Sequence, residues 1–452
     1  MRAQLRGPFG LGAVLTIFFA LFFFSLFKNA QIQRETFHVG FDPGHLGIIW
    51  IPVGLTAALG SVFLVAEFSF GYMAGFYLFA MMAGYFWLNA FSVLVYDHDK
   101  ALLCAVVSIA LFLLPALTVR RVPRWLARLP SLPAIAPELT LGVAAAVLVI
   151  AALYGFKIAG LDEMARLRGT FARPAILNYL IGNVLGALLP FAFACFVLQK
   201  RWAMVAVTGA LALLYYPVTF SKIPLLVPAF LGLIALLSRW LPARFVVVVS
   251  LLAPLCIALL PALGGYLENG TFGVQLFSMI SFRFLAVPAV NLDHYYAFFA
   301  VHPQTWFCHI GLLKSSMTCP YDKQLGVVLA EAYGLGNLNA SMFATEGVAS
   351  VGLLYAPAMA ALCGILIGLG NVASAGLPPR FVLISGAMIA VTLRDVPLSV
   401  AILTNGYGLL MLLWLFAPEY ARARSPLRGA DNARLASFFL SRRLSSAPAT
   451  KM

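Results

Sequence analysis

The feature that most constrains this chain is a run of about 18 or more apolar residues that recurs along its whole length. Each run is long enough to cross a hydrocarbon core of about 30 Å as an α-helix. A soluble chain carries about a quarter charged residues, whereas this one has 10% charged and 62% hydrophobic residues. The pattern therefore predicts an all-α, polytopic integral membrane protein with about twelve transmembrane helices.

The apolar runs also divide the chain into regions. We expect spans at 9–27, 47–66, 70–93, 101–119, 139–156, 176–198, 203–219, 224–238, 245–263, 349–369, 381–393 and 398–417. The first span lacks a small-x-small cleavage pattern after it, so we interpret it as a retained helix rather than a secretory signal. The resulting regions are an N-terminal membrane bundle at 1–263 with an outer loop at 157–175, a large non-spanning loop at 264–348, C-terminal membrane helices at 349–417 and a basic tail at 418–452.

The basic residues indicate the orientation, because Lys and Arg gather on the cytoplasmic side of a membrane. With the N terminus inside, the inner segments carry the whole formal net charge of +14 and the outer face is neutral. This predicts a multi-pass protein of a bacterial inner membrane, with both termini cytoplasmic and the large loop periplasmic. No basic soluble domain carries the charge, so we expect the lipid bilayer as a partner and no nucleic acid.

The outer segment Lys157–Pro174 is unusual because it holds Arg166, Arg168 and Arg173 against the insertion bias. The arginine fork suits phosphate oxygens and carboxylates, which favours an anion site. The alternative is that Arg166 and Arg168 pair with Asp162 and Glu163 across a helical turn.

Two further cations are expected on the outer side. Lys222 lies in the short turn 219–224, and Arg283 is the single charge in the apolar segment 273–285, which could lie in the interface as an amphipathic helix. Each of them either snorkels to the headgroups or meets an anion there.

The large loop also holds the polar residues best suited to acid–base chemistry. His294 stands in a run of polar and aromatic residues, a mixture that suits sugar rings as well as membrane interfaces. It is a candidate acid or base, or else a hydrogen-bonded interfacial histidine. The glycine-containing segment 333–347 carries Asn337, Asn339 and Glu346. Glu346 lies at the mouth of a span, where an ionisable group is a functional hypothesis by default.

Cys308 and Cys319 are the only cysteines expected outside, where disulfides persist. We predict a disulfide bond between them. A metal site that combines these thiols with His302 and His309 is the alternative, but the spacing matches no common metal motif, so no metal is expected. The chain contains no CxxC pair, Walker loop, HExxH motif or GxSxG elbow.

The layout of many spans with a large outer loop late in the chain resembles the O-antigen polymerase (Wzy-type), or oligosaccharide repeat unit polymerase, family. The residues that support the likeness are Arg166, Arg168, Arg173, Lys222 and the segment 333–347. The resemblance implies a metal-independent glycosyltransferase-type polymerase without cofactors, acting in O-antigen, capsule or exopolysaccharide biosynthesis. It would join undecaprenyl-pyrophosphate-linked oligosaccharides at the periplasmic face, and a chain-length-regulating membrane protein is a further possible partner.

The resemblance also gives each candidate residue a role. The implied diphosphate cradle consists of Arg166, Arg168, Arg173, Lys222 and Arg283, the glycan ligands are Asn337 and Asn339, and the catalytic candidates are Glu346 and His294. An O-antigen ligase is the nearest alternative. A polysaccharide or lipid transporter or flippase, and a non-catalytic assembly partner, are alternatives from other classes.

Overall fold

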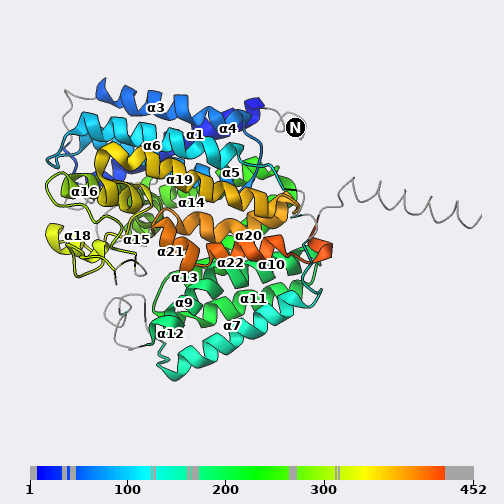
Figure 1. The fold of residues 1–452 in the computed structure, drawn as a ribbon. Helices are drawn as coiled ribbons and strands as arrows, with labels where there is room; N and C mark the ends of the chain where they lie inside the picture. The colour runs from blue at the N-terminus through cyan, green and yellow to red at the C-terminus, as the bar shows by residue number, and fades with distance from the viewer. Residues whose placement is uncertain are drawn as a thin grey trace, which may run out of the picture.

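The computed structural model describes most of the chain as a bundle of helices (Figure 1). The described residues are 8–32, 38–40, 47–123, 126, 129–158, 160, 163, 173–263, 272–310, 313 and 316–422. The expected all-α fold is confirmed for them, since their β-structure is limited to one isolated bridge between Val39 and Ser92.

The helices follow one another along the chain, with the longest connections between α7 and α9 and between α16 and α18. They are α1 (Pro8–Ile32), α3 (Trp50–Gly60), α4 (Val62–Val65), α5 (Phe70–Phe91), α6 (His98–Thr118), α7 (Ala136–Leu153), α9 (Ala175–Asn183), η4 (Val184–Leu188), α10 (Leu189–Leu198), α11 (Trp202–Leu214), α12 (Tyr216–Thr219), α13 (Ile223–Trp240), α14 (Ala243–Leu263), α15 (Phe272–Phe277), η5 (Ser278–Ala286), α16 (Val287–Phe299), α18 (Leu325–Tyr333), η6 (Phe343–Ala349), α19 (Ser350–Ser374), α20 (Pro379–Thr392), α21 (Leu398–Leu403), α22 (Tyr407–Leu415) and η7 (Glu419–Ala421). The elements η4, η5 and η6 are π-helical segments, which are frequent at functional sites.

Eleven helices within the described residues are long and apolar enough to cross a membrane. The first nine coincide with the first nine expected spans, and the eleventh, Phe343–Ser374, begins before the expected residue 349. The last two expected spans differ more. Residues 381–393 fall in α20, a helix of only 14 residues, and 398–417 divides into α21 and α22.

The stretch 264–348 is not the single non-spanning loop that we expected. Phe272–Phe299 forms one continuous helix of 28 residues from α15, η5 and α16, and it is long and apolar enough to span. In α16 every residue from Pro288 to Phe299 is buried, and the helix packs against α5 and η6. The polar residues that made this segment look like a loop are paired inside the bundle, as described below.

The central helix is α5, which is buried on all its faces. The Ser69 side chain caps its start by accepting a hydrogen bond from the Tyr72 amide, 3.1 Å away. Small residues let its neighbours approach closely. A Cβ at Gly71 would lie 2.0 Å from the Ala116 carbonyl oxygen of α6, and one at Gly364 in α19 would lie 2.3 Å from the Phe112 oxygen of α6. Helices α5, α6 and α19 therefore form a closely packed layer.

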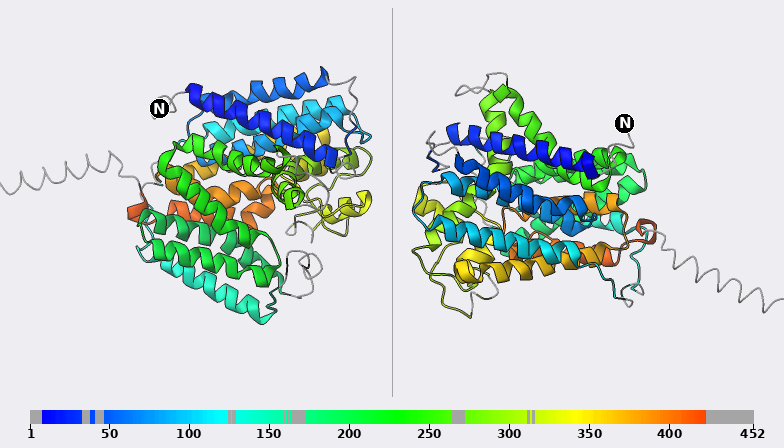
Figure 2. Two further views of the ribbon diagram at one scale, coloured as in Figure 1. Left: turned by 180° about the vertical axis from the view of Figure 1, so that it is seen from behind. Right: turned by 90° about the horizontal axis from the view of Figure 1, so that it is seen from above.

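The two ends of the bundle carry different elements. The start of α1 and the red end of the described chain lie at one end, and α16 and α18 lie at the opposite end (Figure 1). The two further views agree on this arrangement (Figure 2). We name the end that carries α16 and α18 the loop end. The predicted catalytic residues and the disulfide belong to this end.

Candidate functional site

Glu346 lies in η6 at the loop end and is only 5% exposed. Its Oε1 accepts hydrogen bonds from the Ser399 amide at 2.9 Å and from the Ser399 hydroxyl at 2.8 Å. Its Oε2 accepts from the Thr345 hydroxyl at 2.7 Å. The single proton of the Thr345 hydroxyl is shared with the Ser341 carbonyl, which lies 2.9 Å away. The two Ser399 donors and this shared proton hold the Glu346 carboxyl group in one orientation as an acceptor.

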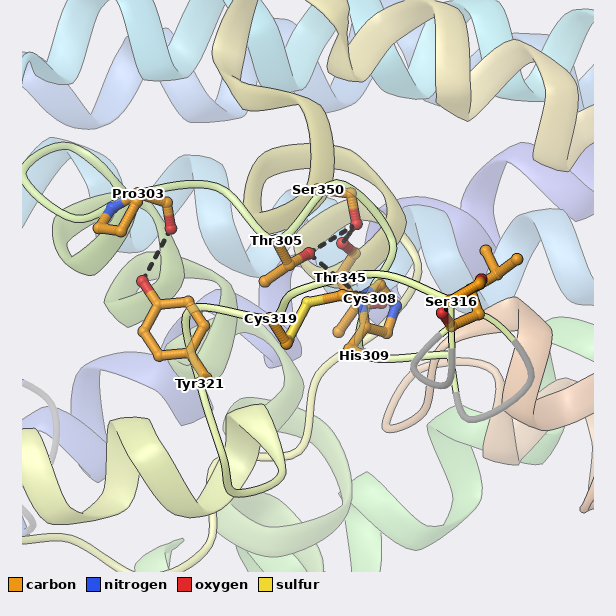
Figure 3. The surroundings of a disulfide bond; sticks show 10 residues. Pro303, Thr305, Cys308, His309, Ser316, Cys319, Tyr321, Thr345 and Ser350 are labelled. Atoms are coloured by element: carbon orange, nitrogen blue, oxygen red, sulfur yellow. Dashed lines mark hydrogen bonds between the residues drawn. A yellow bond between two sulfur atoms is a disulfide. The ribbon is translucent and has the colours of Figure 1, made fainter.

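Cys308 and Cys319 form a disulfide bond with their Cα atoms 5.4 Å apart, in the pairing that we predicted (Figure 3). The segment just before Cys308 is attached to the helix that carries Glu346. The Thr305 amide donates to the Ala349 carbonyl at 2.7 Å, and the Trp306 amide donates to the Ser350 carbonyl at 3.2 Å. The disulfide loop is therefore anchored at the junction of η6 and α19.

A chain of hydroxyl groups orients His309 (Figure 3). The Ser350 hydroxyl donates its single proton to the Thr345 carbonyl at 2.7 Å. The Thr305 hydroxyl lies 3.3 Å from the Ser350 oxygen and must donate there, so it is left as an acceptor for Nδ1 of His309 at 3.2 Å. Only this assignment satisfies all three contacts. Neutral His309 therefore carries its proton on Nδ1 and a lone pair on Nε2.

The Nε2 atom of His309 is buried and has no hydrogen-bond partner among the described residues. Burial lowers the pKa of His309 below its ordinary value of 6.5, and the Glu346 carboxylate acts in the opposite direction. The ring is thus a neutral base beside an anion that would stabilise its protonated form. We name this group the Glu346 cluster; it consists of Thr305, His309, Thr345, Glu346, Ser350 and Ser399.

His294 belongs to a second group, in which both of its ring nitrogens are occupied. Its Nδ1 lies 2.8 Å from the Val290 carbonyl, which can only accept, so Nδ1 carries the proton. Its Nε2 then accepts from Nδ1 of His38 at 3.3 Å. The Tyr333 ring packs edge-on against the His294 ring, with centroids 4.7 Å apart. The predicted acid or base is therefore engaged in structural contacts.

The carboxylate next to His294 is also paired. Asp293 is 1% exposed and accepts hydrogen bonds from the Ser92 hydroxyl at 2.8 Å and from the Tyr96 hydroxyl. These bonds join α16 to the segment that follows α5. We name this group the Asp293 cluster; it consists of His38, Ser92, Tyr96, Asp293 and His294.

The predicted cations do not assemble around Glu346 within the described residues. Arg166 and Arg168 lie outside the described residues. The guanidinium of Arg173 donates to the Val218 carbonyl, and burial lowers its pKa. Lys222 and Arg283 are exposed. The structure therefore brings Arg173 to the α12 segment that precedes Lys222, and Arg283 lies on η5, a separate element.

Asn337 and Asn339 are exposed, and both pack against α18. A Cβ at Gly326 would lie 2.3 Å from Oδ1 of Asn337 and 2.6 Å from Oδ1 of Asn339. The Asn339 carbonyl also accepts a hydrogen bond from the Asn291 side chain. These contacts dock the segment after α18 onto α18 and α16, while the exposed parts of both side chains face outward.

Sequence reasoning missed two residues. His309 was considered only as an alternative metal ligand, although it follows directly on a cysteine of the outward pair. Arg394, which the hydropathy pattern puts just beyond a span, is 2% exposed in the bundle. No group of three or more His, Cys, Asp or Glu side chains able to hold a metal ion occurs in the part of the chain that the structure describes.

Comparisons with known proteins do not identify a relative. No protein-family model, no curated protein and no solved structure matches this chain.

Proposed function

We propose that this protein is a glycosyltransferase-type polymerase of a bacterial inner membrane. It would transfer a growing glycan from undecaprenyl diphosphate to a lipid-linked repeat unit at the periplasmic face. The observation that carries the proposal is the orientation of His309, whose buried Nε2 lone pair has no partner among the described residues. A neutral base held beside a carboxylate suits deprotonation of a sugar hydroxyl.

The reaction can be written with the groups of the Glu346 cluster. The acceptor hydroxyl oxygen forms a bond to the anomeric carbon of the donor, and its proton moves to Nε2 of His309. The bond between that carbon and the diphosphate oxygen breaks, and its electron pair leaves with the diphosphate. The negative charge of Glu346 favours the imidazolium that forms through electrostatic attraction, while the Thr305 hydroxyl accepts from Nδ1 and orients the ring. His309 then returns the proton to the departing diphosphate or to water.

The proposal gives the outer cations a supporting role. A diphosphate leaving group develops negative charge, which cations already in place can stabilise. Arg283 is suited to this role because its side chain is exposed. Lys222 is also exposed. Arg166 and Arg168 stay candidates on sequence grounds alone.

The experiment is a complementation assay in a strain that lacks the gene and makes the corresponding glycan. Wild type and Glu346→Gln are expressed, the glycan length distribution is read on a gel, and protein in the membrane is quantified by immunoblot. Glu331→Gln is the matched control, because Glu331 is a second acid between α16 and α19 but is exposed and paired with Lys323 at 2.6 Å. We expect loss of polymer with single repeats retained in Glu346→Gln, and wild-type glycan in the control.

The other outcomes discriminate between the alternatives. Loss of all attached glycan, single repeats included, would favour the ligase. Unchanged polymer in Glu346→Gln at normal protein level would remove the proposed site. An unchanged glycan in the deletion strain itself would remove the proposed function.

A transporter is the second candidate, and one observation favours it. Transporters carry charged side chains inside the bundle at interrupted helices, and Arg394 lies buried at the break between α20 and α21. A flippase defect would leave lipid-linked repeats in the inner leaflet. The polymerase predicts instead that the deletion strain exposes single repeats on the outer leaflet, which labelling of intact cells with a lectin can test.

A further inference from the structure

Arg394 is a buried cation whose guanidinium is only partly satisfied in the described structure. The carboxylate of its sequence neighbour Asp395 interacts with it electrostatically. The Arg394 side chain is 2% exposed. Its Nε lies 3.3 Å from the Val391 carbonyl, and its Nη2 is buried without a hydrogen-bond partner. It takes part in none of the salt bridges found among the described residues. A buried donor without an acceptor is unfavourable, so the Nη2 group of Arg394 calls for a partner.

The position of Arg394 in the bundle is as informative as its missing partner. Arg394 follows α20, a helix of 14 residues. The start of α20 is attached to α13, because the Arg380 guanidinium donates to the Ser238 hydroxyl and to the Ala235 carbonyl. At 1.5 Å per residue, α20 rises about 21 Å, which is less than the hydrocarbon thickness of about 30 Å. Arg394 therefore lies at membrane depth, toward the loop end, where the backbone breaks before α21.

Two aromatic rings hold the guanidinium in place. Its carbon lies 4.3 Å from the centroid of the Phe284 ring and 5.9 Å from that of Tyr77. The Tyr77 hydroxyl is itself fixed at 2.6 Å from the Ser250 hydroxyl. Aromatic faces stabilise a cation without neutralising it or using its N–H groups. The arrangement leaves the Nη2 donors of Arg394 available for an anion.

We propose that Arg394 binds a phosphate group that enters the bundle from the loop end. Phosphate fits because its oxygens accept hydrogen bonds from a guanidinium and would satisfy the buried Nη2 of Arg394. The group can come from a lipid headgroup or from a free phosphate. Phe284 and the exposed cation Arg283 are neighbours on η5, so a second charge lies one residue from the ring that covers Arg394. This site does not depend on the proposed polymerase activity.

The test uses the full-length protein in nanodiscs of phosphatidylcholine. Thermal unfolding is followed with two probes, inorganic pyrophosphate in solution and a long-chain isoprenyl diphosphate in the disc. A ligand that binds the folded state raises the unfolding temperature. Wild type is compared with Arg394→Gln and with Arg394→Lys, which keeps the charge but loses the fork. Arg380→Gln is the control, because it removes an arginine of the same helix at the other end of the bundle.

We expect at least one probe to stabilise wild type and the Arg380→Gln control. Affinity should fall about tenfold or more in Arg394→Gln, and by less in Arg394→Lys. Stabilisation by the isoprenyl diphosphate alone assigns the site to a lipid headgroup, and stabilisation by both probes shows that the phosphate group suffices. If neither probe acts on wild type, the proposal fails whether or not the variants fold. It also fails if both Arg394 variants bind as wild type does.

Discussion

The Glu346 cluster and the Asp293 cluster both lie at the loop end, and each combines a buried carboxylate with a histidine. In the Asp293 cluster both ring nitrogens of His294 have partners. Nδ1 contacts the Val290 carbonyl and Nε2 contacts the His38 ring. In the Glu346 cluster the chain of contacts ends at Nε2 of His309, which has no partner among the described residues. The difference teaches that residue type alone does not separate the two histidines, whereas the state of the second ring nitrogen does: His294 has no free ring nitrogen, and His309 keeps one for the role that we propose.

The largest expected effect comes from replacing His309 and His294, one at a time. His309→Gln should reduce polymer formation by about 10²–10⁴-fold, the usual contribution of a general base. His294→Gln should reduce it less than tenfold, while lowering the unfolding temperature because Val290 and His38 lose their partner. Polymer formed per unit of protein, in membrane vesicles supplied with lipid-linked repeats, measures the first effect. His302→Gln is the control, since His302 is exposed and stacks on Phe298. The reverse ranking would move the catalytic assignment to the Asp293 cluster.

The disulfide should have the next largest effect, and only on the Glu346 cluster. A double Cys308→Ser and Cys319→Ser variant loses the constraint on the loop that holds His309, which costs about 2–4 kcal/mol of folding stability in typical cases. We expect reduced polymer formation and a lower unfolding temperature, and the same change when wild type is treated with a reductant. Cys195→Ser, which removes a buried free thiol in α10, should not respond in this way. Equal activity in the reduced and oxidised forms would show that the loop does not position His309.

The smallest expected effect is a pH dependence of stability. Because burial lowers the pKa of His309, its neutral form favours the folded state. This stabilisation of the folded state is complete above pH 6.5, the ordinary pKa of histidine, and is lost as the pH falls through the lower pKa of His309 in the folded protein. Glu346 opposes the shift, so the effect should be modest. Between pH 7.5 and 5 the unfolding temperature of wild type should therefore fall more than that of His309→Gln. Parallel curves for the two proteins would indicate that His309 is as accessible to protons in the folded state as in the unfolded one.

Hydropathy was enough to predict the scaffold but not the site. The first nine spans follow from apolar length alone, and the disulfide pair follows from the few cysteines expected outside. Residues 272–299 were misjudged because Asp293 and His294 lower the hydropathy, whereas in the structure their polar atoms are paired with partners more than 190 residues away in sequence. A single sequence does not reveal such pairings.

The cations illustrate the same limit. Arg173 stands out in the sequence because its charge is on the unexpected side, yet its guanidinium is turned to the Val218 carbonyl, 45 residues away. From the sequence, Arg394 was expected at the end of a span. It is buried in the structure, where the Phe284 and Tyr77 rings lie against its guanidinium. The direction of a side chain depends on tertiary neighbours, and these are not encoded in local composition.

The complete burial of α5 has a consequence for biosynthesis. It is the least apolar of the candidate spans, with tyrosines, glycines and an asparagine along its length. A nascent segment of this kind partitions weakly into lipid by itself. We expect earlier helices that stay beside the exit site of the translocon to assist its insertion, before the later neighbours α6, α16, α19 and α20 complete its burial. The order of synthesis fits this expectation, since α1 and α3, which both pack on α5, emerge from the ribosome first.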